Sequence, residues 1–93
     1  MLSPEERPTA IRQALEAKLT VQSLEIVDES HLHAGHAGAK SGKGHFALTI
    51  VAEEFAADSL IARHRRVYGA LGELMQSDIH ALSIDARSPE EAG

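Results

Sequence analysis

The segment His45-Phe46-Ala47-Leu48-Thr49-Ile50-Val51 (residues 45–51) decides how this chain folds. Large branched and aromatic side chains alternate along it, which is the period-two pattern of a β-strand. One predicted face carries Phe46, Leu48 and Ile50, and the other carries Ala47, Thr49 and Val51. The remaining predicted elements flank this strand in the sequence.

Two further stretches predict strands. Residues 24–28 are rich in branched side chains, and residues 79–87 keep Leu82, Ile84 and Ala86 in one phase. The connection between the strands at 24–28 and 45–51, residues 31–44, is glycine-rich and lacks periodicity. Connections of this length are uncommon in small domains and are often functional.

Two stretches have the apolar spacing of helices. The first runs from about residue 8 to residue 19, and the second covers residues 59–76 with Asp58 or Ser59 as its cap. The apolar stripe predicted for the second helix comprises Leu60, Ile61, His64, Val67, Tyr68, Leu71, Leu74 and Met75. The order α-β-β-α-β predicts an α+β fold, a three-stranded mixed sheet covered by helices, with room for a short C-terminal helical turn.

This order also predicts which ends of the strands meet. A strand, a helix and a second strand form a right-handed crossover, so strands 45–51 and 79–87 run parallel and begin at one edge of the sheet. The connection 31–44 closes an antiparallel hairpin at that same edge. Five of the six histidines are therefore predicted to gather there, namely His31, His33, His36, His45 and His80.

Length and composition limit the class of protein. The 93 residues fit a single domain over residues 1–93, with a firm core over about 8–87 and polar ends at 1–7 and 88–93. The net charge of −5 argues against broad binding to nucleic acid, and no apolar run reaches the roughly 20 residues of a membrane span. Cysteine is absent, which excludes disulfides and thiol nucleophiles. We expect a cytoplasmic protein that is a monomer or a weak homodimer.

The histidines are the residues that could bind a metal. Imidazole is a common metal ligand, and zinc could take three or four of these side chains, with His80 closing the site from the sheet. An iron–sulfur cluster needs sulfur ligands that this chain lacks, but two imidazoles could bind one iron if a partner supplied the sulfurs. The competing interpretation is that the histidines of the connection are solvated and that His80 caps its strand.

One histidine and three arginines stand together on the second predicted helix. His64 falls on the apolar stripe, so we expect it to be buried, hydrogen-bonded and structural. Arg63, Arg65 and Arg66 form a basic patch that fits contact with phosphate or with an acidic partner, and equally a solvated helix face. No catalytic triad in a supporting context, phosphate loop or dinucleotide motif occurs, so we expect no enzyme activity.

Five motifs follow one another along the chain, namely Leu24-Glu25-Ile26-Val27-Asp28-Glu29-Ser30, His31-x-His33, Gly44-His45-Phe46, Ser59-Leu60-Ile61-x-Arg63-His64-Arg65-x-Val67-Tyr68 and Ile79-His80-Ala81-Leu82-Ser83-Ile84. Together they resemble the BolA family over roughly residues 10–90. The resemblance implies a fold like the class II KH domain. It also implies a partnership with monothiol glutaredoxins, in which a [2Fe–2S] cluster bridges the two proteins.

The resemblance also implies which residues bind the cluster. In this family the histidine that opens the third strand is a ligand, which maps onto His80. The second ligand comes from the connection between the first two strands and maps onto His33, with His31 and His36 as alternatives. The partner's cysteine and its bound glutathione would supply the sulfurs, so no cofactor is expected in the isolated chain. The implied function is iron–sulfur cluster handling or iron-linked regulation.

BolA-like proteins are also linked to DNA binding and to transcriptional control of morphology and stress genes, a role that Arg63, Arg65 and Arg66 would serve here. The Gly-x-x-Gly loop of KH domains is not found before the long helix, and the net charge of −5 weakens this alternative. The chain departs from the family pattern at two points. The turn after Phe55 lacks the frequent glycine, and the connection carries the additional His36.

Overall fold

The computed structural model describes residues 1–33 and 42–93. In chain order its elements are α1 (Arg7–Lys18), β1 (Val21–Asp28), η1 (Ser30–His33), β2 (Gly44–Ala52), η3 (Glu53–Ala57), α2 (Leu60–Leu71), α3 (Leu74–Ser77), β3 (Ile79–Arg87) and α4 (Pro89–Ala92). Each predicted helix and strand has a counterpart, and the bounds of β3 match the prediction. No helix in these described ranges is long and apolar enough to cross a membrane.

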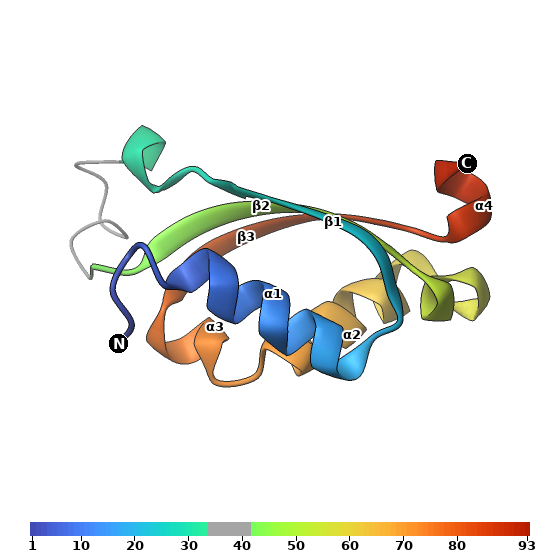
Figure 1. Cartoon of the computed structure of the whole chain (residues 1–93), viewed down its shortest axis with the longest axis horizontal. Coiled ribbons are helices and arrows are strands. Elements are labelled where there is room, and N and C mark those ends of the chain that lie inside the picture. Colours follow the sequence, from blue (N-terminus) through green and yellow to red (C-terminus); the bar gives the residue numbers. More distant parts are fainter. Residues whose placement is uncertain (34–41) are drawn as a thin grey trace.

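The three strands form one mixed sheet in the order β1-β2-β3. The pair β1 and β2 is antiparallel, and β2 and β3 are parallel, as the sequence predicted. Helices α1, α2 and α3 all lie on one face of the sheet, and α4 lies beyond one end of β3 (Figure 1). The predicted fold class is therefore confirmed.

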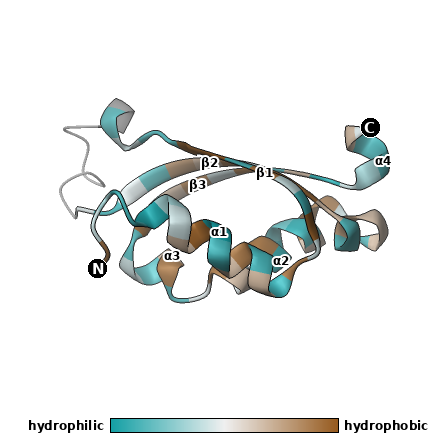
Figure 2. Cartoon of the chain, viewed as in Figure 1, coloured by the Kyte–Doolittle hydropathy of each residue, from teal (hydrophilic) through white to brown (hydrophobic). Residues whose placement is uncertain are grey.

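The hydrophobic core lies between the sheet and these helices. Phe46, Leu48 and Ile50 of β2 are at most 2% exposed, and they pack in one cluster with Leu15 of α1 and Val67 of α2. Hydrophobic residues lie along the middle of the sheet and on the helices below it, whereas α4 is largely hydrophilic (Figure 2). The glycine-free turn after β2 forms the short helix η3, whose Phe55 is fully buried in the core.

The helix predicted over residues 59–76 is interrupted. Ser59 is its cap, because the Ser59 Oγ accepts a hydrogen bond of 3.1 Å from the backbone N–H of Ala62. Gly72 ends α2 with a φ of 54°, in the left-handed region that favours glycine. The prediction of one continuous helix was therefore wrong, and α3 begins two residues after this glycine.

The buried face of α2 also differs from the predicted stripe. Arg63, Val67 and Leu71, spaced four residues apart, are buried, whereas Leu60 is 69% and Ile61 is 66% exposed. The expectation that His64 is buried was wrong, because this residue is exposed. Neighbouring helical positions differ by about 100° around the axis, so burying Arg63 turns His64 toward solvent.

Both ends of the chain contact the folded core instead of extending from it. The backbone N–H of Leu2 donates a hydrogen bond of 2.8 Å to Asp78. Near the other end, Ser88 and Glu91 form a reciprocal capping box at the start of α4. The polar composition of these ends reflects specific hydrogen bonds, which composition alone does not reveal.

Candidate functional site

The end of β1 and the starts of β2 and β3 meet at one edge of the sheet, as predicted. The backbone N–H of Gly44 donates to the carbonyl of Asp78 over 2.8 Å, which joins the starts of β2 and β3. The backbone N–H of Glu29 donates to the carbonyl of His45 over 2.8 Å, and the N–H of His45 donates to the Ser30 Oγ over 3.1 Å. These bonds define a rim to which three separate parts of the chain contribute.

His80 lies on this rim at an irregularity of the β2–β3 pairing. Gly44 pairs with Ile79 and the next residue, His45, pairs with Ala81, so the register skips His80. Such a bulge redirects the side chain of the additional residue. His80 is exposed, and its ring centroid is 5.2 Å from that of His45, which is only 6% exposed. The predicted proximity of these two histidines is confirmed.

The other candidate histidines begin at the same rim. Asp28 accepts a hydrogen bond of 2.9 Å from the backbone N–H of Ser30 at the start of η1, which contains the exposed His31 and ends at His33. The side chain of His33 and the whole of His36 lie outside the described part of the structure. Within that described part, no three His, Cys, Asp or Glu side chains form a group that could hold a metal ion.

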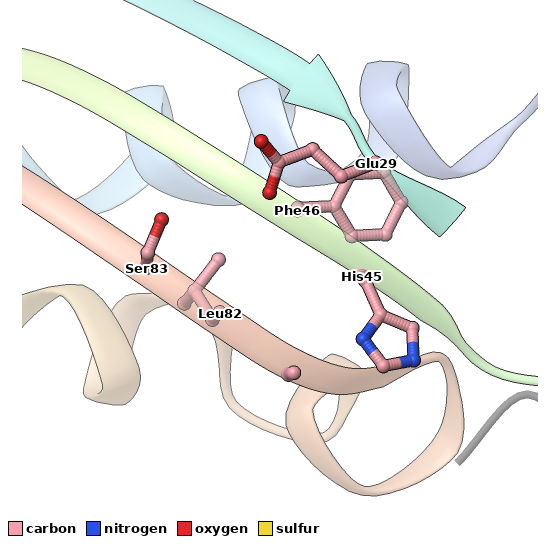
Figure 3. A pocket seen from close by; sticks show the side chains of 6 residues that line it. Glu29, His45, Phe46, Leu82 and Ser83 are labelled. Carbon is pink, nitrogen blue, oxygen red and sulfur yellow. The ribbon is translucent and has the colours of Figure 1, made fainter. Parts of the chain in front are cut away.

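A hollow of about 200 Å³ adjoins the rim. Figure 3 shows the residues around it, with Glu29 following β1, His45 and Phe46 on β2, and Leu82 and Ser83 on β3. Gly44 keeps this corner tightly packed, because an added Cβ would lie 2.6 Å from Phe46 Cε2 and 3.1 Å from Ser30 Oγ. The sequence motif Gly44-His45-Phe46 therefore has a steric basis.

A buried ion pair that no sequence pattern indicated lies beside the rim. Arg7 and Asp78 are separated by 71 positions, yet their side chains are 5% and 3% exposed and lie 3.2 Å apart. Burial alone would raise the pKa of Asp78, but hydrogen bonds from Ser77, Leu2 and Arg7 together lower this pKa below its ordinary value. No local pattern links the two residues, so only the tertiary fold reveals the pair.

The basic patch expected on α2 is smaller than the sequence indicated. Arg63 is 7% exposed and donates to the carbonyl of Ala86 over 3.0 Å and to Glu91 over 2.6 Å. Arg66 forms an ion pair with Asp58. Placing Arg63 in a surface patch was therefore wrong, because its guanidinium joins α2 to β3 and α4.

The fold and rim define a class of small α+β domain with one mixed sheet and an exposed histidine at the start of its third strand. The family model described as "BolA-like protein" matches residues 15–91. The chain therefore belongs to the BolA family, as its sequence motifs indicated.

Individual relatives support this assignment. The chain is 42% identical over 90 residues to SufE-like protein 1, chloroplastic/mitochondrial, of Arabidopsis thaliana, covering 91% of this chain but only 24% of that protein. It is 34% identical to the DNA-binding transcriptional regulator BolA of Escherichia coli, covering 87% of this chain and 78% of the relative. The solved BolA domain of SufE1 from Arabidopsis thaliana matches with a TM-score of 0.80 and 41% identity, over 98% of this chain and 99% of that domain.

Proposed function

We propose that this chain binds a monothiol glutaredoxin through a shared [2Fe–2S] cluster and acts in iron–sulfur cluster handling or iron-linked regulation. The observation that supports this most directly is the exposed imidazole of His80 on the rim from which η1 and its His33 also depart. Imidazole nitrogens can bind one iron of such a cluster when thiolates bind the other.

The donor set of the chain fits this shared arrangement. Because the sequence contains no cysteine, a partner must supply every thiolate ligand. His80 and His33 would hold the cluster from this side, with His31 and His36 as alternatives to His33. The ring of the buried His45 lies beside that of His80. When bound, the cluster would supply a redox-active iron centre whose potential depends on its ligands.

Anaerobic reconstitution with a monothiol glutaredoxin, glutathione, iron and sulfide tests the proposal. The wild-type chain should form a heteromeric complex whose visible absorption and circular dichroism differ from those of the glutaredoxin alone. His80→Ala should lose this signature. His64→Ala, which removes an exposed histidine of α2 instead, should keep it. Identical spectra and complex yields for wild type and His80→Ala would show that His80 is not a ligand.

The second ligand can be assigned in the same assay. Single substitutions His31→Ala, His33→Ala and His36→Ala remove the three candidates one at a time. We expect His33→Ala to match His80→Ala, with the other two close to wild type. If His31→Ala or His36→Ala alone abolished the signature, the ligand would be that residue instead.

DNA binding is the second candidate function, because the Escherichia coli relative carries that name. Of the three arginines in the predicted basic patch, Arg63 is buried against Glu91 and Arg66 is paired with Asp58. The exposed Arg65 is therefore the one that stays available to bind phosphate. Binding to a promoter duplex should weaken as salt rises, and Arg65→Ala should weaken it further. Unchanged affinity of Arg65→Ala would exclude this use of α2.

A further inference from the structure

Arg7 connects three parts of the chain beside the histidine rim. It is the first residue of α1, yet it is only 4% exposed. Its Nε donates to Asp78 Oδ2 over 3.2 Å, and its Nη2 donates to the carbonyl of Gly42 over 2.7 Å. The guanidinium thus contacts both the chain that enters β2 and the residue that stands two positions before His80.

Asp78 makes matching contacts from the opposite side. Its Oδ2 also accepts from the backbone N–H of Leu2 over 2.8 Å, and its Oδ1 accepts from the Ser77 Oγ over 2.5 Å. Its own carbonyl accepts from the N–H of Gly44 over 2.8 Å. Asp78 therefore holds the stretch Gly42–Gly44 in two ways. Its side chain acts through Arg7, and its backbone carbonyl accepts directly from Gly44.

We propose that Arg7 and Asp78 are positioning residues of the candidate site, which hold the chain at Gly42–Gly44 in a fixed place relative to the start of β3. The consequence is that the start of β2, with His45 beside the His80 ring, keeps a fixed place relative to the start of β3. Its consequence for cluster binding rests on the proposed function, whereas the positioning itself does not.

The chemistry of the pair favours positioning over simple stabilisation. Two buried charges lose their hydration, and apolar residues of similar size often stabilise a fold equally well. A guanidinium, however, presents several donors in a rigid plane, so one side chain can serve a carboxylate and a backbone carbonyl together. Lysine would keep the charge beside Asp78 but has only one nitrogen, which cannot occupy the places of both Nε and Nη2.

Amide hydrogen exchange tests the positioning directly. In Arg7→Lys, which keeps a positive charge beside Asp78, the Gly44 amide should exchange at least about tenfold faster than in wild type. The Leu48 and Ile50 amides in the centre of β2 should speed up only by the smaller factor that follows from any change in global stability. Arg12→Gln is the matched control, because Arg12 is another α1 arginine with an exposed ion pair, and it should leave Gly44 unchanged. Equal acceleration at all three amides, or none at Gly44, would overturn the proposal.

Cluster reconstitution with a monothiol glutaredoxin tests the consequence for the site. At a temperature where all variants are folded, Arg7→Lys should lower the yield of the heteromeric complex at least about threefold and change its visible circular dichroism, and Arg12→Gln should match wild type. A wild-type yield and spectrum for Arg7→Lys would overturn this consequence. If wild type itself forms no complex, the proposed function fails, and the exchange measurement still decides the positioning.

Discussion

The two ends of the sheet each contain a buried arginine with similar hydrogen bonds. At the rim, Arg7 donates to the carbonyl of Gly42 and to Asp78. At the opposite end, Arg63 donates to the carbonyl of Ala86 and to Glu91. In both places, one guanidinium satisfies a backbone carbonyl and a carboxylate from distant parts of the chain.

The two arginines differ in what they join and in how exposed their partners are. Arg63 connects regular elements, α2, β3 and α4, and its partner Glu91 is 51% exposed. Arg7 connects irregular chain at Gly42 to Asp78, whose side chain is only 3% exposed. The same chemical arrangement therefore joins α2, β3 and α4 at one end and holds the starts of β2 and β3 together at the other.

The largest effect should come from Asp78→Ala, which leaves the Arg7 charge buried without its carboxylate. We expect a loss of about 3–5 kcal/mol in the free energy of unfolding, measured by urea denaturation. Asp85→Ala is the matched control, because Asp85 pairs with Arg87 at the surface and should cost less than about 1 kcal/mol. Equal losses for the two variants would contradict the difference in burial.

At the opposite end, Arg63→Met should have a smaller effect. The carbonyl of Ala86 loses its donor, which costs about 1–3 kcal/mol for a buried group, but Glu91 can be hydrated because it is half-exposed. The same urea measurement applies, with the exposed Arg65→Met as control. A loss larger than that of Asp78→Ala would reverse the proposed ranking of the two ends.

The pH dependence should separate the contribution of Glu91. Hydrogen bonds from the Ser88 backbone and from Arg63 lower the pKa of Glu91 to about 2, from an ordinary value of 4.5. Because this pKa is depressed in the folded state, the stabilisation is present above pH 4.5 and is lost as the pH falls toward 2. The stability difference between wild type and Glu91→Gln should shrink over this window. A titration of the Glu91 carboxyl by NMR with a midpoint near 4.5 would refute this expectation.

The smallest effect should come from His64→Ala, although this residue neighbours the buried Arg63. Since His64 is exposed, the free energy of unfolding should change by no more than about 0.5 kcal/mol. Val67→Ala, at a fully buried position of the same helix, should cost several times more. A loss above about 1 kcal/mol for His64→Ala would restore the sequence-based expectation of a structural histidine.

The strands and their common edge could be predicted because strand periodicity reflects burial directly. Phe46, Leu48 and Ile50 alternate as a half-buried face requires, and the crossover rule then places the starts of β2 and β3 together. That reasoning correctly brought His45 and His80 to the same rim. It could not predict the skipped register position that leaves His80 exposed, because the irregularity depends on pairing between distant residues.

The phase of α2 and the buried ion pairs could not be predicted, for a related reason. The predicted stripe assumed that the buried face of the helix is apolar, whereas Arg63 is buried with a carboxylate 28 positions away in the chain. Arg7 likewise meets Asp78 across 71 positions. A buried charge is tolerated only when its partner is in place, and the sequence around either residue gives no sign of that partner.

The last turn of the chain has a consequence for the order in which the molecule assembles. A four-residue helix such as α4 is unstable alone, since forming its first turn costs more than one hydrogen bond returns. Its capping oxygen, Glu91 Oε1, accepts from both the Ser88 N–H and Arg63. Because Arg63 belongs to α2, α4 gains this contact only after α2 has packed on the sheet. We therefore expect α4 to order late in folding and to loosen early in denaturant. Protection of the Glu91 amide from hydrogen exchange that arises after protection of the β2 amides would demonstrate this order.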